Sequence, residues 1–145
     1  LTGDTAAAAE ILLESCRALH AEHRWFHLAT QAAELAGLLV TLGRDAEADE
    51  WCALSERFAS EQDVSAQLWR RLSRARILLR EGNPSSARRL VAEARSLSES
   101  TDSLNAQAAV HRVAAELDGP EQLEAAFDLY MQKGNVAAAA LLRAE

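Results

Sequence analysis

Residues 43–48 read Gly-Arg-Asp-Ala-Glu-Ala, and residues 82–87 read Gly-Asn-Pro-Ser-Ser-Ala. Each segment places an alanine five residues after a glycine, between two long amphipathic segments. Glycine ends a helix well because it enters the left-handed backbone region without strain. Alanine is small enough to let the next helix pack closely against the one before it. The pattern therefore predicts a helix–turn–helix unit around each glycine.

The same spacing recurs towards both ends of the chain. Gly3 precedes Ala8 by five residues, and Gly119 is followed one residue late by Ala125. Four glycines, at positions 3, 43, 82 and 119, are thus separated by 40, 39 and 37 residues. A period in this range is typical of helical repeats. We expect a turn at each of these glycines, so that the chain starts part-way through a repeat.

Apolar residues between these glycines recur at helical spacing, as in Leu28, Leu35 and Leu39. The residues expected to begin helices agree with this reading; they are Asp45, Asp63, Asn83 followed by Pro84, and Asp102. The predicted helices cover residues 4–21, 24–42, 45–59, 64–80, 84–98, 103–117, 121–132 and 136–143. Short links make neighbouring helices antiparallel, and each pair must bury its apolar stripe on the next pair. We predict an all-α fold, a right-handed α-solenoid of about eight helices forming one domain over residues 1–145.

The Gly-x-x-x-x-Ala turn between antiparallel helices resembles that of the tetratricopeptide repeat. Ala36 and Ala75 supply a small residue seven positions before a glycine, as that family does. The repeats are longer than the family's roughly 34 residues, so the chain is tetratricopeptide-like. Residues 129–140 resemble the helical tail of large bacterial signalling proteins that carry a cyclase or ATPase regulator domain. The resemblance implies an interaction module of a multidomain signalling or transcriptional regulator, with no catalytic residue. The chain begins without a methionine, so we expect a fragment of a longer protein.

Composition excludes several function classes. The net charge of −7 disfavours binding to nucleic acids and to anionic membranes. No apolar run approaches the roughly 18 residues needed to span a bilayer. Cys16 and Cys52 fall inside helical patterns and do not resemble a disulfide framework, so we expect a reducing, cytoplasmic setting.

Histidine and cysteine spacing raises one metal hypothesis. Cys16, His20, His23 and His27 would share a face if one helix ran through all four. A turn is expected near His23, however, and histidines at a helix C-terminus suit the helix dipole without any metal. We therefore expect no metal site, and we keep these four residues as the weak alternative.

Motifs for catalysis are absent from the sequence. It has no phosphate-binding loop, no Gly-x-Ser-x-Gly and no His-Glu-x-x-His. We expect a protein that is not an enzyme and that needs no cofactor.

A binding groove is the predicted functional site. In tetratricopeptide repeats the first helix of each pair lines a concave surface, and tryptophan and arginine are enriched at binding hot spots. We expect a protein or peptide with an acidic group to dock there. Trp69 would be its anchor, and arginines its clamps. The groove residues predicted on this basis are Thr30, Trp69, Arg76, Arg80 and Glu116.

Two alternatives stay open. The arginines of residues 70–95 could instead form salt bridges with acidic neighbours, and Arg76 and Arg80 could pair with Glu34 or Glu116. The chain could also act as a self-association module, forming a homodimer through the uncapped ends of its solenoid.

Overall fold

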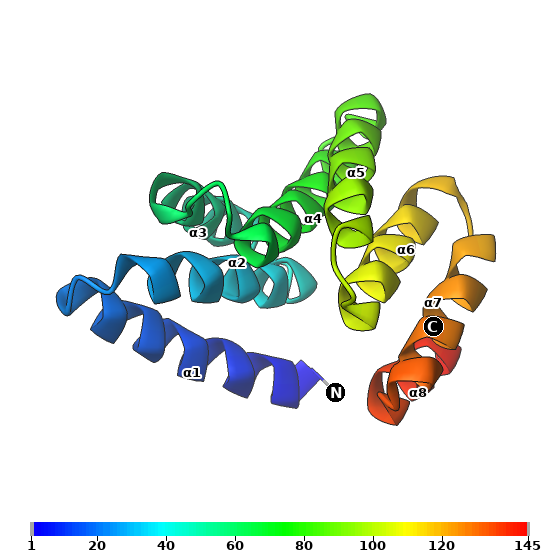
Figure 1. Ribbon diagram of the computed structural model, residues 1–145, viewed down its shortest axis with the longest axis horizontal. Coiled ribbons are helices and arrows are strands. Elements are labelled where there is room, and N and C mark those ends of the chain that lie inside the picture. Colours follow the sequence, from blue (N-terminus) through cyan, green and yellow to red (C-terminus); the bar gives the residue numbers. More distant parts are fainter. Residues whose placement is uncertain (1, 145) are drawn as a thin grey trace.

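The computed structural model describes residues 2–144, and every regular element in that range is an α-helix (Figure 1). Each predicted helix is present, and each end lies within two residues of its predicted position. The eight helices are α1 (Thr2–Ala21), α2 (Trp25–Thr41), α3 (Asp45–Phe58), α4 (Val64–Arg80), α5 (Pro84–Glu99), α6 (Leu104–Asp118), α7 (Glu121–Lys133) and α8 (Val136–Ala144).

Local side chains set several of the helix starts. Asp63 and Asn83 each accept a hydrogen bond from the backbone N–H three residues later, as expected for helix caps. At α6 the cap is Ser103 and not Asp102, because the hydroxyl of Ser103 is the acceptor that meets the first turn. Asp45 is the first residue of α3, where its charge suits the positive end of the helix dipole.

Glycines form the turn between the two helices of three pairs, but one of the four predicted glycine turns is wrong. Gly43, Gly82 and Gly119 have positive φ angles of 75°, 78° and 116° and follow α2, α4 and α6. Gly3 instead lies inside α1, so it marks no turn. A further left-handed glycine, Gly134, ends α7 with φ 78°. The repeat spacing therefore holds from residue 43 onward and does not extend to the first glycine.

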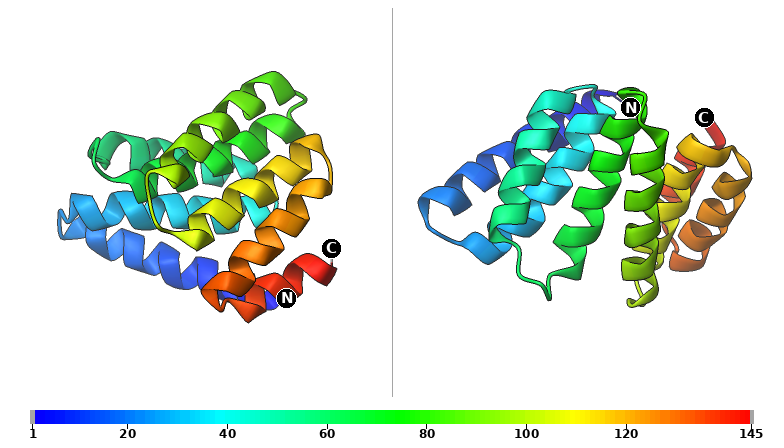
Figure 2. Two further views of the ribbon diagram at one scale, coloured as in Figure 1. Left: turned by 45° about the vertical axis from the view of Figure 1, so that its right-hand side comes forward. Right: turned by 90° about the horizontal axis from the view of Figure 1, so that it is seen from above.

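The helices stack as successive pairs. α2 packs on α3, α4 on α5, and α6 on α7, while α1 covers α2 and α8 covers α7. The first two pairs meet through α2 with α4 and α3 with α4, and the next two through α5 with α6 and α4 with α6. Within residues 2–144, α3 and α5 share no contact. Figure 2 shows successive helices of the chain lying side by side along the stack, from α1 (blue) to α7 (orange). We call α2, α4 and α6, the first helices of the three pairs, the inner row. The contacts fit a helical repeat.

The core is divided into three clusters along this row. Leu28 and Leu35, both fully buried, belong to the first cluster, between α1, α2 and α3. Leu68 lies in the second cluster, between α4, α5 and α6. Tyr130 belongs to the third, between α6, α7 and α8. The first cluster also includes Ile77 of α4, so each cluster is shared by three or four neighbouring helices, as expected where each pair buries its apolar stripe on the next.

Small residues at the pair turns allow this packing. Ala48 and Ala87, each five residues after a turn glycine, have no exposed surface. After Gly119 the buried alanine is Ala126, and the predicted Ala125 is only half-buried. Ala126 follows its turn glycine by seven residues, whereas Ala48 and Ala87 follow theirs by five.

Two glycines, one inside α2 and one in the turn after α4, offer a matched stability test. Gly37 is inside α2, and a Cβ there would lie 3.7 Å from the Ser73 hydroxyl oxygen, an ordinary contact. We expect Gly37→Ala to raise the free energy of unfolding by about 0.5–1 kcal/mol, since alanine loses less backbone entropy on folding. We expect Gly82→Ala to lower it by about 1–2 kcal/mol, because an L side chain is strained at φ 78°. Urea unfolding measures both. A destabilised Gly37→Ala would mean that α2 and α4 pack more closely than described.

Candidate interaction groove

A groove of about 490 Å³ opens on the inner row of helices. α2, α4 and α6 each present side chains spaced three or four residues apart, the spacing that places residues on one helix face. The lining residues from these helices are Ala33, Glu34, Gly37, Leu38, Thr41, Trp69, Leu72, Ser73, Arg76, Ala109, Arg112, Val113 and Glu116. Leu12 of α1 and Tyr130 of α7 complete the lining, so the row of helices curves around the groove.

Trp69 forms part of the groove wall and is only half-buried. Its ring packs against the second core cluster, alongside Leu72 and Val113. The backbone carbonyl of Trp69 accepts a hydrogen bond of 3.0 Å from the Ser73 hydroxyl. The indole therefore has a supported position and an exposed part. An aromatic side chain held in this way is suited to anchor a ligand.

Arg76 spans the groove wall and is already paired. Its Nε lies 2.9 Å from a carboxylate oxygen of Glu116 on α6. One of its terminal nitrogens donates to the Thr41 hydroxyl on α2, at 3.2 Å. Three inner helices are thus joined through one guanidinium group. Of the two pairings considered for this arginine, the structure has the one with Glu116.

Thr30 and Arg80, both predicted to line the groove, lie outside it. Arg80 is the last residue of α4 and pairs with Asp45, at the start of α3. Thr30 donates a hydrogen bond of 3.0 Å to the Asp63 carboxylate, which also caps α4. Each of these side chains lies near one end of its helix, away from the helical turns that line the groove. Each therefore links neighbouring helix pairs and does not face the groove.

Glu34 is a groove residue that the prediction did not include as a ligand contact. It lies on α2 one turn before Gly37 and Leu38 and lines the groove. Among residues 2–144, its carboxylate makes no ion pair and no hydrogen bond. Desolvation by the surrounding walls raises the pKa of Glu34. Its position three and four residues from groove-facing residues is the signal that could have identified it.

The weak metal alternative does not form. α1 ends at Ala21, and His23 takes a left-handed backbone with φ 57°. His20 and His23 both meet the Trp25 ring edge-on, at centroid distances of 5.4 and 5.1 Å. Cys16 is fully buried in the first core cluster. Across the described part of the chain, no three His, Cys, Asp or Glu residues gather as metal ligands would.

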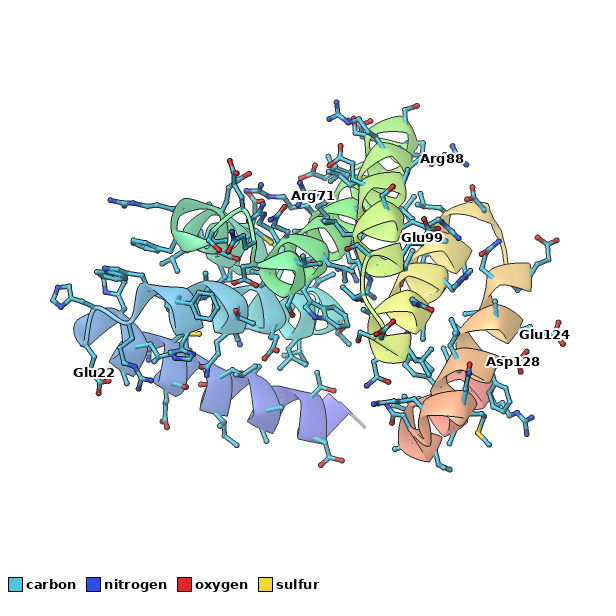
Figure 3. The ribbon with its side chains drawn as sticks, viewed as in Figure 1. Glu22, Arg71, Arg88, Glu99, Glu124 and Asp128 are labelled. Atoms are coloured by element: carbon cyan, nitrogen blue, oxygen red, sulfur yellow. The ribbon has the colours of Figure 1, made fainter. Side chains whose placement is uncertain are left out.

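The arginines on the outer side form salt bridges, as the alternative reading of this basic block expected. Arg71 of α4 pairs with Glu93 of α5 at 2.9 Å, and Arg74 pairs with Glu56 of α3 at 2.7 Å. α4 therefore reaches both outer neighbours, although α3 and α5 do not touch. Figure 3 labels Arg71 of α4 and Arg88 of α5 on this side of the molecule. Further pairs on this side are Arg70 with Glu56, Arg74 with Asp49, and Arg88 with Asp118.

The Thr30–Asp63 link offers a stability test that is independent of the groove. Asp63→Ala removes both a helix cap and the partner of a half-buried hydroxyl. We expect it to lower the free energy of unfolding by about 1–2 kcal/mol. The control is Asp102→Ala, which is exposed and caps no helix and should change stability by less than about 0.5 kcal/mol. Equal effects in urea unfolding would show that the link contributes nothing.

Comparison with protein-family models, curated proteins and solved structures gave no match for this chain. None of the described helices is both long enough and apolar enough to cross a bilayer.

Proposed function

We propose that this chain is a protein-interaction module that holds a peptide segment of a partner in the groove between α2, α4 and α6. In this proposal it is a right-handed, tetratricopeptide-like repeat domain of a cytoplasmic bacterial signalling or transcriptional regulator, and it is not an enzyme. The observation that carries the proposal is Trp69, half-exposed within a groove of about 490 Å³ that three successive inner helices line.

The walls of the groove support a peptide ligand. Ala33, Gly37 and Ala109 are small and leave room, while Leu72 and Val113 add apolar surface beside the indole. Grooves of this size, mostly apolar with a few polar groups, are typical of binding sites. A bound segment would bury the exposed part of Trp69, and burying apolar surface contributes roughly 25 cal/mol per Å².

Ion pairs within the chain already engage the two arginines that were expected to bind an acidic partner. Arg80 is outside the groove, and Arg76 is held by Glu116. A partner with an acidic group would therefore compete with Glu116 for a single arginine. Such competition lowers the net gain, because the broken ion pair offsets the new one.

The binding test uses peptides and one anchor variant. An array of nonapeptides of varied sequence is probed with the folded domain, and the strongest ligands are measured in solution by fluorescence anisotropy. Trp69→Ala should weaken their affinity by about 2 kcal/mol or more, as expected for an anchor at a hot spot. Trp51→Ala is the matched control, because Trp51 packs against the first core cluster and does not line the groove. If both variants bind equally well, the groove is not the binding site.

Self-association is the second candidate, and exposed apolar residues near the end of the chain favour it. Met131 of α7 and Val136 and Leu141 of α8 are 47%, 61% and 38% exposed. An uncovered apolar face at the end of a helical stack is a surface on which a second copy can pack. Sedimentation velocity across a range of concentrations tests this. A dimer that Val136→Asp dissociates would support it, and a monomer at all concentrations would exclude it.

A further inference from the structure

We infer that the partner segment is cationic, and that a lysine or arginine of the segment pairs with Glu34 while an apolar neighbour packs on Trp69. This inference rests on the proposed groove function and adds the charge of the ligand to it.

The charged side chains that line the groove are partly paired within the chain. Arg76 and Glu116 neutralise each other at 2.9 Å, and Arg76 is further held by Thr41. Glu34 lines the same groove, yet no cation in the described part of the chain pairs with it. The second arginine of the lining, Arg112 of α6, also makes an interaction of its own. The groove therefore presents a carboxylate that is open to a ligand, while both of its arginines are already occupied.

The surroundings of the Glu34 carboxylate favour a cationic partner. Glu34 is an exposed residue at the groove, and partial burial of its carboxylate raises its pKa. A carboxylate in partly apolar surroundings is more strongly stabilised by an incoming cation than one in bulk water, because the local dielectric is lower. A guanidinium or ammonium group would also supply the hydrogen-bond donors that Glu34 lacks.

The apolar part of a cationic side chain also fits the groove. Lysine and arginine carry long apolar stems, which pack on apolar walls such as those formed by Leu38 and Leu72. A cation can also lie over the face of a tryptophan, here Trp69. The net charge of −7 favours the approach of a positively charged segment over a negatively charged one. Shape, local charge and overall charge thus agree on one ligand class.

The test compares matched peptides. Fluorescein-labelled nonapeptides contain one leucine and one variable residue two to four positions away. The variable residue is arginine, norleucine or glutamate, and the remaining positions are the same. Arginine peptides should bind most tightly. Glu34→Gln, which keeps the shape and removes the charge, should weaken them about tenfold. Glu34→Lys should reverse the preference towards glutamate peptides.

The matched control is Glu50→Gln. Glu50 is exposed on α3, lies outside the groove, and changes the net charge of the domain by the same amount. It should leave all affinities within about twofold. Circular dichroism and urea unfolding of every variant establish that the folded domain is being compared.

Each outcome separates the two proposals. Arginine preference that Glu34→Gln removes and Glu50→Gln retains supports the cationic ligand. Binding that needs Trp69 but favours glutamate or norleucine, or that responds equally to both glutamine variants, overturns the cationic ligand and leaves the groove function standing. If no peptide binds in a Trp69-dependent way, both proposals fail.

Discussion

Leu35→Ala is expected to lower the free energy of unfolding by about 2–5 kcal/mol, a large part of the total for a domain of this size. Leu35 has no exposed surface and lies in the first core cluster, where α1, α2 and α3 meet. Removing its branched end loses hydrophobic transfer energy. It also leaves a cavity that three helices bound, and rigid walls collapse only partly. Urea unfolding followed by circular dichroism measures the effect.

The control for this variant is Ile11→Ala on α1. Ile11 is 68% exposed, so truncating it should change stability by less than about 0.5 kcal/mol. The two variants remove similar numbers of atoms from residues on neighbouring helices. A small effect at Leu35 would mean that the first cluster is not packed as described.

The two cysteines should react with a thiol reagent such as DTNB at pH 8 roughly 100-fold or more slowly in the folded protein than in urea. Burial raises the pKa of the Cys16 thiol to about 11 and that of Cys52 to about 12. Only the thiolate reacts, so a raised pKa removes the reactive form and burial blocks access to it. Ser96→Cys, at an exposed position on α5, supplies a fast-reacting control. Fast reaction of both native thiols would contradict their burial.

The same raised pKa values link folding to pH. An unfolded thiol ionises near pH 8.5, whereas the folded thiols stay protonated to about 11 and about 12. Their contribution to stability is therefore fully present below about pH 8.5 and falls as pH rises towards those values. Urea unfolding at pH 7 and pH 10 should show lower stability at the higher pH, and Cys52→Ala should reduce the difference.

The helices could be predicted from the sequence because their ends are set by neighbouring residues. Asp63 and Asn83 cap the helices they were expected to begin, and each bond reaches only three residues. The errors arose where two local choices compete. Asp102 and Ser103 can both cap a helix, and in the structure Ser103 accepts the hydrogen bond from the first turn of α6. Gly3 has the right spacing for a turn, yet a glycine can also lie within a helix.

The groove could be predicted only in part. Helical spacing placed Trp69, Arg76 and Glu116 on the lining face, where the structure has them. The same spacing also includes Thr30 and Arg80, because one face of a helix runs along its whole length. The groove is lined only by the part of each helix that lies close to the other two. Leu12 and Tyr130 belong to the lining through the curvature of the row, which depends on how successive pairs tilt. The tilt between successive pairs cannot be predicted from the spacing of the repeats.

The gap between α3 and α5 has a mechanical consequence. The inner helices touch in sequence, and the outer helices also pack on inner ones, α3 on α4 and α5 on α6. Ion pairs from α4, including Arg71 with Glu93 and Arg74 with Glu56, add to these contacts on the outer side. Ion pairs near the surface weaken as salt is added, while apolar contacts do not. The domain is therefore held together by apolar contacts, which salt leaves unchanged, and by ion pairs on both its inner and its outer side, which salt weakens. Its bending stiffness, and with it the ease with which the groove widens, should fall as ionic strength rises.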